Sequence, residues 1–260
     1  MKVIYNFYKR LKYYIKSGLT LVTQTNFLVI FRLLKGNGLL KLKDGTKFRL
    51  RNLMDLWIVK ESYLDEDYLV NGFEIPKEAV IVDIGAFIGD YSVWAAKQSS
   101  RSIIFAIEPS QENYRFLQTN IQLNKLNNIR PFHLAIHSHK NEVLLTTTKG
   151  NLGQSHISRD DNDRNEKVQA MSLENFFNVN RITSCQILKL DCEGSEYDIL
   201  RNSDPGFLNN HIEKIVMEFH ETKQNTHQDL VDYLEKAGYK VSLFPPKFEN
   251  GTGFLSAKRT

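Results

Sequence analysis

A glycine turn between two apolar segments most constrains what this chain can fold into. Residues 80–89 read Val-Ile-Val-Asp-Ile-Gly-Ala-Phe-Ile-Gly, and residues 105–109 read Phe-Ala-Ile-Glu-Pro. Glycines let a backbone approach a ligand closely, and a helix start presents unpaired N–H groups. Glu108 follows Gly89 by 19 residues, near the spacing of about 20 that places an acid beside a ribose. The pattern predicts a nucleoside-containing cofactor at the carboxyl ends of two parallel strands.

The spacing of the glycines indicates which cofactor this is. A dinucleotide fingerprint has a second glycine that makes room for a pyrophosphate, whereas the bulky Phe87 lies between Gly85 and Gly89 here. A P-loop would need Gly-Lys-Ser/Thr after the turn, which is missing. S-adenosylmethionine has a ribose but no phosphate and fits better. We expect its amino-acid end near Asp83 and the turn, and its ribose on Glu108. The predicted cofactor contacts are Asp83, Gly85, Ala86, Gly89, Glu108, Pro109 and Ala135.

Several segments resemble, in order, the motifs of FkbM-family methyltransferases. They are residues 82–92, the Glu108-Pro109 pair with the helix behind it, residues 188–196 (Leu-Lys-Leu-Asp-Cys-Glu-Gly-Ser-Glu), residues 215–220 and a lead-in helix over residues 55–68. The resemblance covers about residues 50–258, and it departs from the family at Phe87, where the family usually has Asn. It implies a class I S-adenosylmethionine-dependent O-methyltransferase, often one that acts on sugar or polyketide hydroxyls.

Alternating strand and helix patterns predict the architecture. The expected fold is α/β and Rossmann-like, a class I methyltransferase with a seven-stranded, mostly parallel sheet, helices on both faces and an antiparallel final hairpin. We expect an N-terminal helical and hairpin extension over residues 1–75 and a cofactor-binding domain over residues 76–260. The expected strands are 79–84, 102–107, 130–135, 185–191, 212–219, 239–244 and 253–258; the expected helices are 90–98, 110–124, 172–178, 194–201 and 225–237.

Charge divides the chain into two parts. Residues 1–43 hold nine Lys and Arg and no acid, which leaves 25 basic against 30 acidic residues in the remainder. An acidic main domain does not favour a nucleic-acid partner. Apolar residues recur at helical spacing over residues 1–16, and a second apolar run lies in 20–35. These two expected helices either cap the main domain, pack on a second subunit in a homodimer, or contact an anionic membrane peripherally through residues 1–35.

The sequence also bears on location and on a surface loop. No stretch reaches the roughly 20 apolar residues of a membrane span, and charged residues interrupt the first 16 positions, unlike a signal peptide. Cys185 and Cys192 suit neither a disulfide framework nor a zinc site. We therefore expect a cytoplasmic protein, with membrane-peripheral attachment as an alternative. Residues 148–167 are polar and irregular, which favours a lid or substrate loop.

Methyl transfer to a hydroxyl needs an aligned acceptor and a group that takes its proton. Asp191 follows the expected fourth strand, and Glu218 and His220 end the fifth, alternating so that they share one face. These three are the candidate catalytic residues, with His220 a plausible base because its ordinary pKa is about 6.5. Oxygen-rich ligation by the same three residues would suit Mg²⁺, but no metal site is favoured.

Lys189 is expected to pair with Asp191 or Glu193, and Glu193 and Glu196 either cap a helix or serve the site. The leading hypothesis is O-methylation of a sugar, glycan or small natural product. RNA methylation is the alternative, although the Asn-Pro-Pro type motif of tRNA guanine methyltransferases is missing after the fourth strand. A non-catalytic nucleoside-binding module is a third hypothesis.

Overall fold

The main sheet is the one the sequence predicts. The computed structural model describes residues 2–36, 38–69, 74–138, 141–147, 155–157, 165–222, 224–244 and 252–260. Its largest sheet has seven strands in the order β12-β13-β11-β10-β3-β4-β5. They are β3 (Val80–Ile84), β4 (Ile103–Glu108), β5 (Ile129–His133), β10 (Cys185–Leu190), β11 (Ile212–His220), β12 (Tyr239–Phe244) and β13 (Thr252–Arg259).

Strand directions also agree with the prediction. β3 runs parallel to both β4 and β10, and β10 runs parallel to β11. β13 runs antiparallel to β11 and to β12, so the chain ends in the expected hairpin. The strand order reverses direction beside β3, where β4 lies on one side and β10 on the other. In an open α/β sheet such a switch point is where a ligand binds, beyond the carboxyl ends of the strands.

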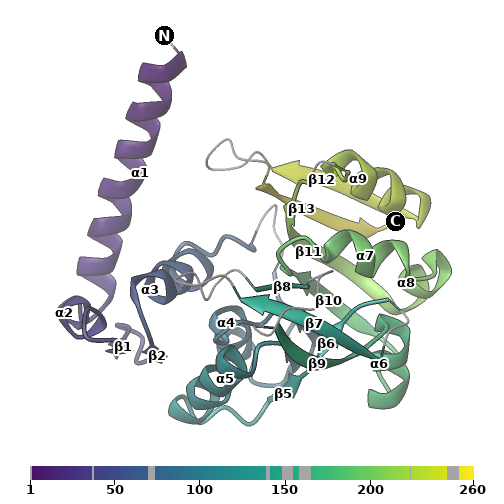
Figure 1. Ribbon diagram of the computed structural model, residues 1–260, viewed down its shortest axis with the longest axis horizontal. Coiled ribbons are helices and arrows are strands. Elements are labelled where there is room, and N and C mark those ends of the chain that lie inside the picture. Colours follow the sequence, from purple (N-terminus) through teal and green to yellow (C-terminus); the bar gives the residue numbers. More distant parts are fainter. Residues whose placement is uncertain are drawn as a thin grey trace.

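Helices cover both faces of this sheet (Figure 1). Successive side chains of a strand point to opposite faces: Ile81 and Ile187 join one buried cluster, whereas Val82 and Leu188 join the other. The first cluster includes α4 (Asp90–Gln98) and α5 (Gln111–Leu123). The second includes α6 (Leu173–Asn180), α7 (Glu196–Arg201), α8 (Pro205–His211) and α9 (His227–Lys236). The short α8 was not predicted, because its opening Pro-Gly pair is typical of a turn.

The N-terminal extension packs on the first face. It contains α1 (Lys2–Gln24), α2 (Val29–Leu33), the hairpin of β1 (Gly38–Lys41) and β2 (Lys47–Leu50), α3 (Leu53–Val59) and the π-helix η1 (Lys60–Leu64). The hairpin was expected. The prediction that one helix ends near residue 16 and a second begins near residue 20 is wrong. α1 continues through Gly18, and the nearby Ser17 and Leu21 are buried. Among the described residues, no helix is both long and apolar enough to span a membrane.

A second sheet includes part of the expected polar loop. β6 (Ala135–Ile136), β7 (Glu142–Thr147), β8 (Ser155–Ile157) and β9 (Asn165–Met171) pair in the order β6-β9-β7-β8. The prediction of an irregular loop is therefore wrong for residues 155–157 and 165–167. Residues 148–154 and 158–164 lie outside the described residues, so a lid there stays a prediction. Val168 and Ala170 alternate with polar neighbours and are buried. The dense charge of residues 159–167 concealed this strand pattern.

Gly85 is required by a close approach within the protein. Its φ is +76°, and a Cβ at this position would lie 1.8 Å from the backbone oxygen of Asp191, which follows β10. Gly45 offers a matched control because its φ is +85° and no described atom would lie within 4 Å of its Cβ. We expect Gly45→Ala to lower the free energy of unfolding by about 1–2 kcal/mol. Gly85→Ala should cost at least about 3 kcal/mol, because overpacking adds to the same backbone strain. Urea denaturation of both variants measures the difference, and equal losses would contradict the steric role of Gly85.

Candidate active site

A cavity of about 620 Å³ opens at the carboxyl ends of the central strands. This lies within the range of roughly 300–1,000 Å³ that small-molecule sites occupy. Its lining comes from the ends of β3, β4, β10, β11 and β13, from β6 and β7, and from α1, α3 and η1. The predicted residues Gly85, Glu108, Pro109, Ala135, Asp191, Glu218 and His220 all line it. The topology therefore brings together most of the residues that the sequence singled out.

Glu108 is held firmly at the end of β4. Its Oε2 accepts a hydrogen bond from the Phe87 backbone N–H (2.9 Å), and its Oε1 accepts from the Ser110 N–H (2.9 Å) and the Asn113 side chain (3.2 Å). Burial raises the pKa of Glu108 to about 7, although these donors and Lys189 act in the opposite direction. A carboxylate has about four lone-pair sites. Three are used here, which leaves one for a hydroxyl in the cavity.

The glycine turn accommodates the large side chain of Phe87. Its backbone has a positive φ of +49°, and its ring lies beneath the guanidinium of Arg51, 5.3 Å from ring centroid to Cζ. The backbone N–H of Phe87, rather than its side chain, makes the contact with Glu108. Departure from the usual Asn of the family at this position therefore leaves the glycine turn intact.

Three predicted cofactor contacts do not belong to the cavity lining that the described residues form. Asp83 is fully buried, and its carboxylate accepts from the Ser92 hydroxyl (2.5 Å) beneath α4. This placement does not favour its expected contact with the amino-acid end of a cofactor, which stays a prediction. Ala86 is also buried. Gly89 begins α4, where a Cβ would meet Leu117 at 2.8 Å, so this glycine serves packing.

Lys189 links the sheet interior to the cavity. Its Nζ lies 3.1 Å from Asp83 Oδ1 and 3.8 Å from Asp191 Oδ2, and it donates to the Gly85 carbonyl (2.8 Å). Burial lowers its pKa, but the charges of Asp83 and Asp191 outweigh burial and hold the pKa above its usual range. The predicted pairing with Asp191 is confirmed, whereas Asp83 is the nearer partner. Lys189 thus stays cationic and neutralises a carboxylate that the interior could not otherwise hold.

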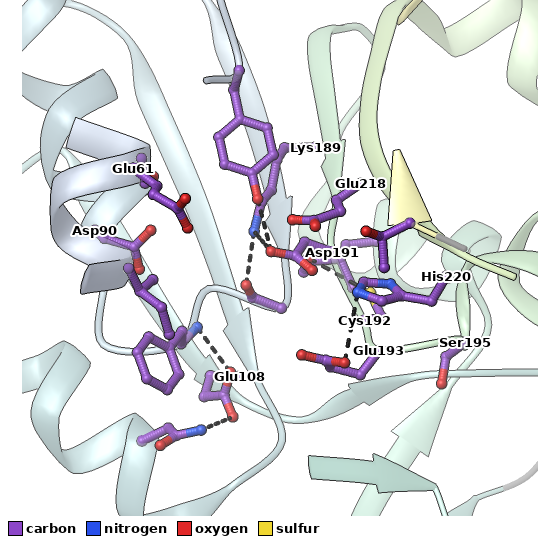
Figure 2. Close-up of a pocket in the computed structure, with 18 of the residues that line it drawn as sticks. Glu61, Asp90, Glu108, Lys189, Asp191, Cys192, Glu193, Ser195, Glu218 and His220 are labelled. Carbon is purple, nitrogen blue, oxygen red and sulfur yellow. Dashed lines mark hydrogen bonds and ion pairs between the residues drawn. The ribbon is translucent and has the colours of Figure 1, made fainter. Parts of the chain in front are cut away.

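Carboxylates from two neighbouring strands face the same part of the cavity (Figure 2). Asp191 follows β10, and its Oδ2 accepts a hydrogen bond from the Tyr68 hydroxyl (2.7 Å). Glu218 lies near the end of β11, between the buried Met217 and Phe219. Burial and then the nearby charge of Asp191 raise the pKa of Glu218 to about 8. A carboxyl group with a pKa near the working pH is well suited to accept a proton.

His220 does not have the environment of a base. Its Nε2 lies 3.6 Å from Glu193 and its Nδ1 lies 3.4 Å from the buried Glu196. Burial lowers the pKa of His220, but the combined effect of Glu196, followed by Asp191 and Glu193, is larger. The net result is a pKa raised to about 10. The neighbouring carboxylates therefore favour the protonated imidazole, which has no free nitrogen to take a proton from an acceptor. This environment favours Glu218 over His220 as a general base, and the catalytic role of His220 stays a prediction.

The only three-residue group with metal-ligating geometry in the described part of the chain is Asp191, Glu196 and His220, whose ligand atoms lie within 4.8 Å of one another. Glu218 is not in it, although the sequence suggested it. Glu196 accepts from the backbone N–H groups of Cys192 (2.6 Å) and Gly194 (3.0 Å). A protonated histidine beside a carboxylate that already holds two donors fits an ion pair better than a Mg²⁺ site.

We accordingly expect methyl transfer to be unchanged, within about twofold, by a chelator in excess over all divalent cations. The physical reason is that a cation would have to displace the proton of His220 and the donors to Glu196. Initial rates measured with and without chelator, followed by addition of Mg²⁺, test this. Loss of activity that Mg²⁺ restores would contradict it.

Sequence reasoning did not identify the residues that the N-terminal extension contributes to the cavity. Glu61 and Ser62 of η1 line the cavity, as do Tyr14 of α1 and Trp57 of α3. Figure 2 shows Glu61 and Asp90 on the opposite side of the cavity from Glu218 and His220. A π-helical turn inserts an extra residue and is frequent at functional sites. The apolar and acidic pattern of residues 54–68 predicted a helix, but it carries no signal for this turn.

The fold and this cavity together define a class I methyltransferase: a Rossmann-like, seven-stranded sheet with an antiparallel last strand and a glycine turn and acid at its switch point. The chain belongs to the FkbM methyltransferase domain family, whose pattern matches residues 83–241.

Several known proteins are similar to this chain. "Methyltransferase 1" of Beauveria bassiana is 26% identical over 212 residues, which are 73% of this chain and 83% of that protein. A fibrillarin/Nop5p complex has a similar fold, with a TM-score of 0.52 and 13% identity over 85% of this chain and 88% of that one. The structure of Methanocaldococcus jannaschii TYW2 in complex with AdoMet has a TM-score of 0.47 and 20% identity, covering 86% of this chain and 87% of that one.

Proposed function

We propose that this chain transfers the methyl group of S-adenosylmethionine to a hydroxyl of a sugar, a glycan or a small natural product. The observation that carries the proposal is that one cavity is lined by two sets of residues. Gly85 of the glycine turn and the firmly held Glu108 lie at one end, and Glu218 and Asp191 lie at the other. S-adenosylmethionine would supply an electrophilic methyl group there. The free lone pair of Glu108 suits a ribose hydroxyl, and Pro109 and Ala135 offer apolar surface for the base.

The catalytic role of the protein is to place the acceptor and to receive its proton. Glu218 is the proposed general base, since it lines the cavity and its pKa is raised to about 8. Asp191, fixed by the Tyr68 hydroxyl, would orient the acceptor through a second hydrogen bond. His220 would hold Glu193 in place through their ion pair.

The charge of the cavity supports a neutral, hydroxyl-rich acceptor over RNA. Its lining has seven carboxyl groups, from Glu61, Asp67, Asp90, Glu108, Asp191, Glu193 and Glu218, against the basic Lys189 and His220. A phosphate close to the reacting hydroxyl would meet like charge, which costs binding energy. Carboxylates accept hydrogen bonds from sugar hydroxyls without that penalty.

Two measurements test the proposal. Isothermal titration with S-adenosylmethionine should show binding, with NAD as the comparison ligand; absence of binding would favour a non-catalytic module. Methyl-labelled S-adenosylmethionine is then offered with neutral sugars, nucleotide sugars, lipid-linked glycans and tRNA side by side. Label in a sugar hydroxyl is expected. Label only in tRNA would overturn the assignment in favour of RNA methylation.

A further inference from the structure

An apolar stripe runs along the solvent side of α1. It consists of Tyr8, Leu11, Ile15, Leu19 and Val22, spaced three or four residues apart, so they share one face of the helix. Each of these side chains is at least 43% exposed. Ser17 and Leu21 lie on the opposite face and are buried against the body of the protein. The helix is thus anchored by one face while it presents a second apolar face outward.

The neighbouring helix α2 also exposes apolar side chains. Val29 and Leu33 of α2 are buried, whereas Leu28, Phe31 and Leu34 are exposed by at least 66%. Figure 1 shows α1 and α2 together at one side of the molecule, with the N-terminal end of α1 clear of the other elements. Exposed apolar residues that occur singly need no explanation, but a contiguous set of this kind marks an interaction surface.

The charges around the stripe indicate the partner. Residues 1–43 contain nine Lys and Arg and no acid, and Lys12, Lys16, Arg32 and Lys35 are exposed. An amphipathic helix with aromatic and aliphatic residues on one face and basic residues beside it binds in the interface of anionic lipid bilayers. A second copy of this chain that docked the same surface would bring two basic segments together, which is electrostatically unfavourable.

We propose that the exposed face of α1 and α2 is a binding site for anionic lipid surfaces, on which the protein lies peripherally. Tyr14 of α1 also lines the cavity and contacts Trp57, with 5.8 Å between their ring centroids. Lipid binding by α1 would therefore hold the cavity close to the membrane surface. Binding of this kind needs neither cofactor nor acceptor, so it can be measured apart from methyl transfer.

Co-sedimentation of the full chain with vesicles tests the proposal. We expect binding to vesicles of phosphatidylglycerol and phosphatidylcholine, at least tenfold weaker binding to phosphatidylcholine alone, and release at high salt because the attraction is partly electrostatic. The double variant Ile15→Glu/Leu19→Glu should bind at least tenfold more weakly. Lys12→Gln/Lys16→Gln, which keeps the apolar stripe, should weaken binding to the anionic vesicles in particular.

Val179→Glu is the matched control, since Val179 is 66% exposed on α6 and distant from the basic segment in sequence; it should bind like the parent protein. Circular dichroism confirms that each variant is folded. Light scattering measures the oligomeric state and so tests the alternative that this surface binds a second copy of the chain. A dimer of the parent chain that dissociates in the Ile15→Glu/Leu19→Glu variant, without binding to either vesicle, would overturn the proposal and identify the surface as a self-interface.

Discussion

Replacing Glu218 by Gln is expected to lower kcat by about 10²–10⁴-fold, the usual contribution of a general base. The amide keeps the size and hydrogen-bonding capacity of the side chain but cannot take the proton of an acceptor hydroxyl. Affinity for S-adenosylmethionine should stay within about twofold, because Glu218 lies on β11, whereas the predicted cofactor contacts lie on β3, β4 and β6 or directly after β3 and β4. Initial rates and isothermal titration on the same preparation measure both quantities.

The pH profile separates Glu218 from the other carboxyl groups. Because its pKa is raised to about 8, the ionised form that accepts a proton becomes more abundant as pH rises. The rate should therefore increase about tenfold per pH unit below 8 and level off above it. This limb should vanish in Glu218→Gln. A rate that is already flat from pH 6 upward would contradict the role of Glu218.

Glu213 provides a matched control on the same strand. It is partly exposed at the start of β11, outside the cavity lining formed by the described residues. Glu213→Gln makes the same chemical change at the far end of β11, so kcat and its pH dependence should be unchanged within about twofold. A comparable loss of kcat in this control would mean that the effect of Glu218→Gln is structural.

Lys189→Met is expected to lower the free energy of unfolding by about 3–5 kcal/mol, the usual cost of removing one partner from a buried ion pair. The variant leaves Asp83, which is fully buried, without the cation 3.1 Å away. Its carboxylate must then stay charged in the protein interior or take up a proton. Urea denaturation with a probe of the sheet measures the loss.

Two comparisons make this prediction specific. Lys240→Met removes an exposed lysine from β12 and should change stability by no more than about 0.5 kcal/mol. The double variant Asp83→Asn/Lys189→Met removes both charges, and it should be more stable than Lys189→Met alone because no unpaired charge remains. If the double variant were no more stable than the single one, the ion pair would not be what stabilises this part of the sheet.

Much of the fold followed from local pattern. The apolar segments that became β3, β4 and β10 are almost entirely buried, so their composition alone indicated a central parallel sheet. Ser110 caps α5 by accepting from the Asn113 N–H, and serine is a preferred residue at this position. Patterns failed where tertiary contacts decided the outcome, as at Gly18 inside α1 and in β9, whose buried positions are interspersed with charge.

The site divides in the same way. Sequence by itself determined that Gly85, Glu108, Asp191 and Glu218 would meet, because the carboxyl ends of adjacent parallel strands lie at one edge of a sheet. Only the tertiary structure decided their protonation and their partners. Whether a carboxyl or imidazole group is ionised depends on burial and on charges distant in sequence. Asp83 pairs with Lys189 inside the sheet, and His220 lies between two glutamates that raise its pKa, because side chains separated along the chain come within a few ångströms of each other.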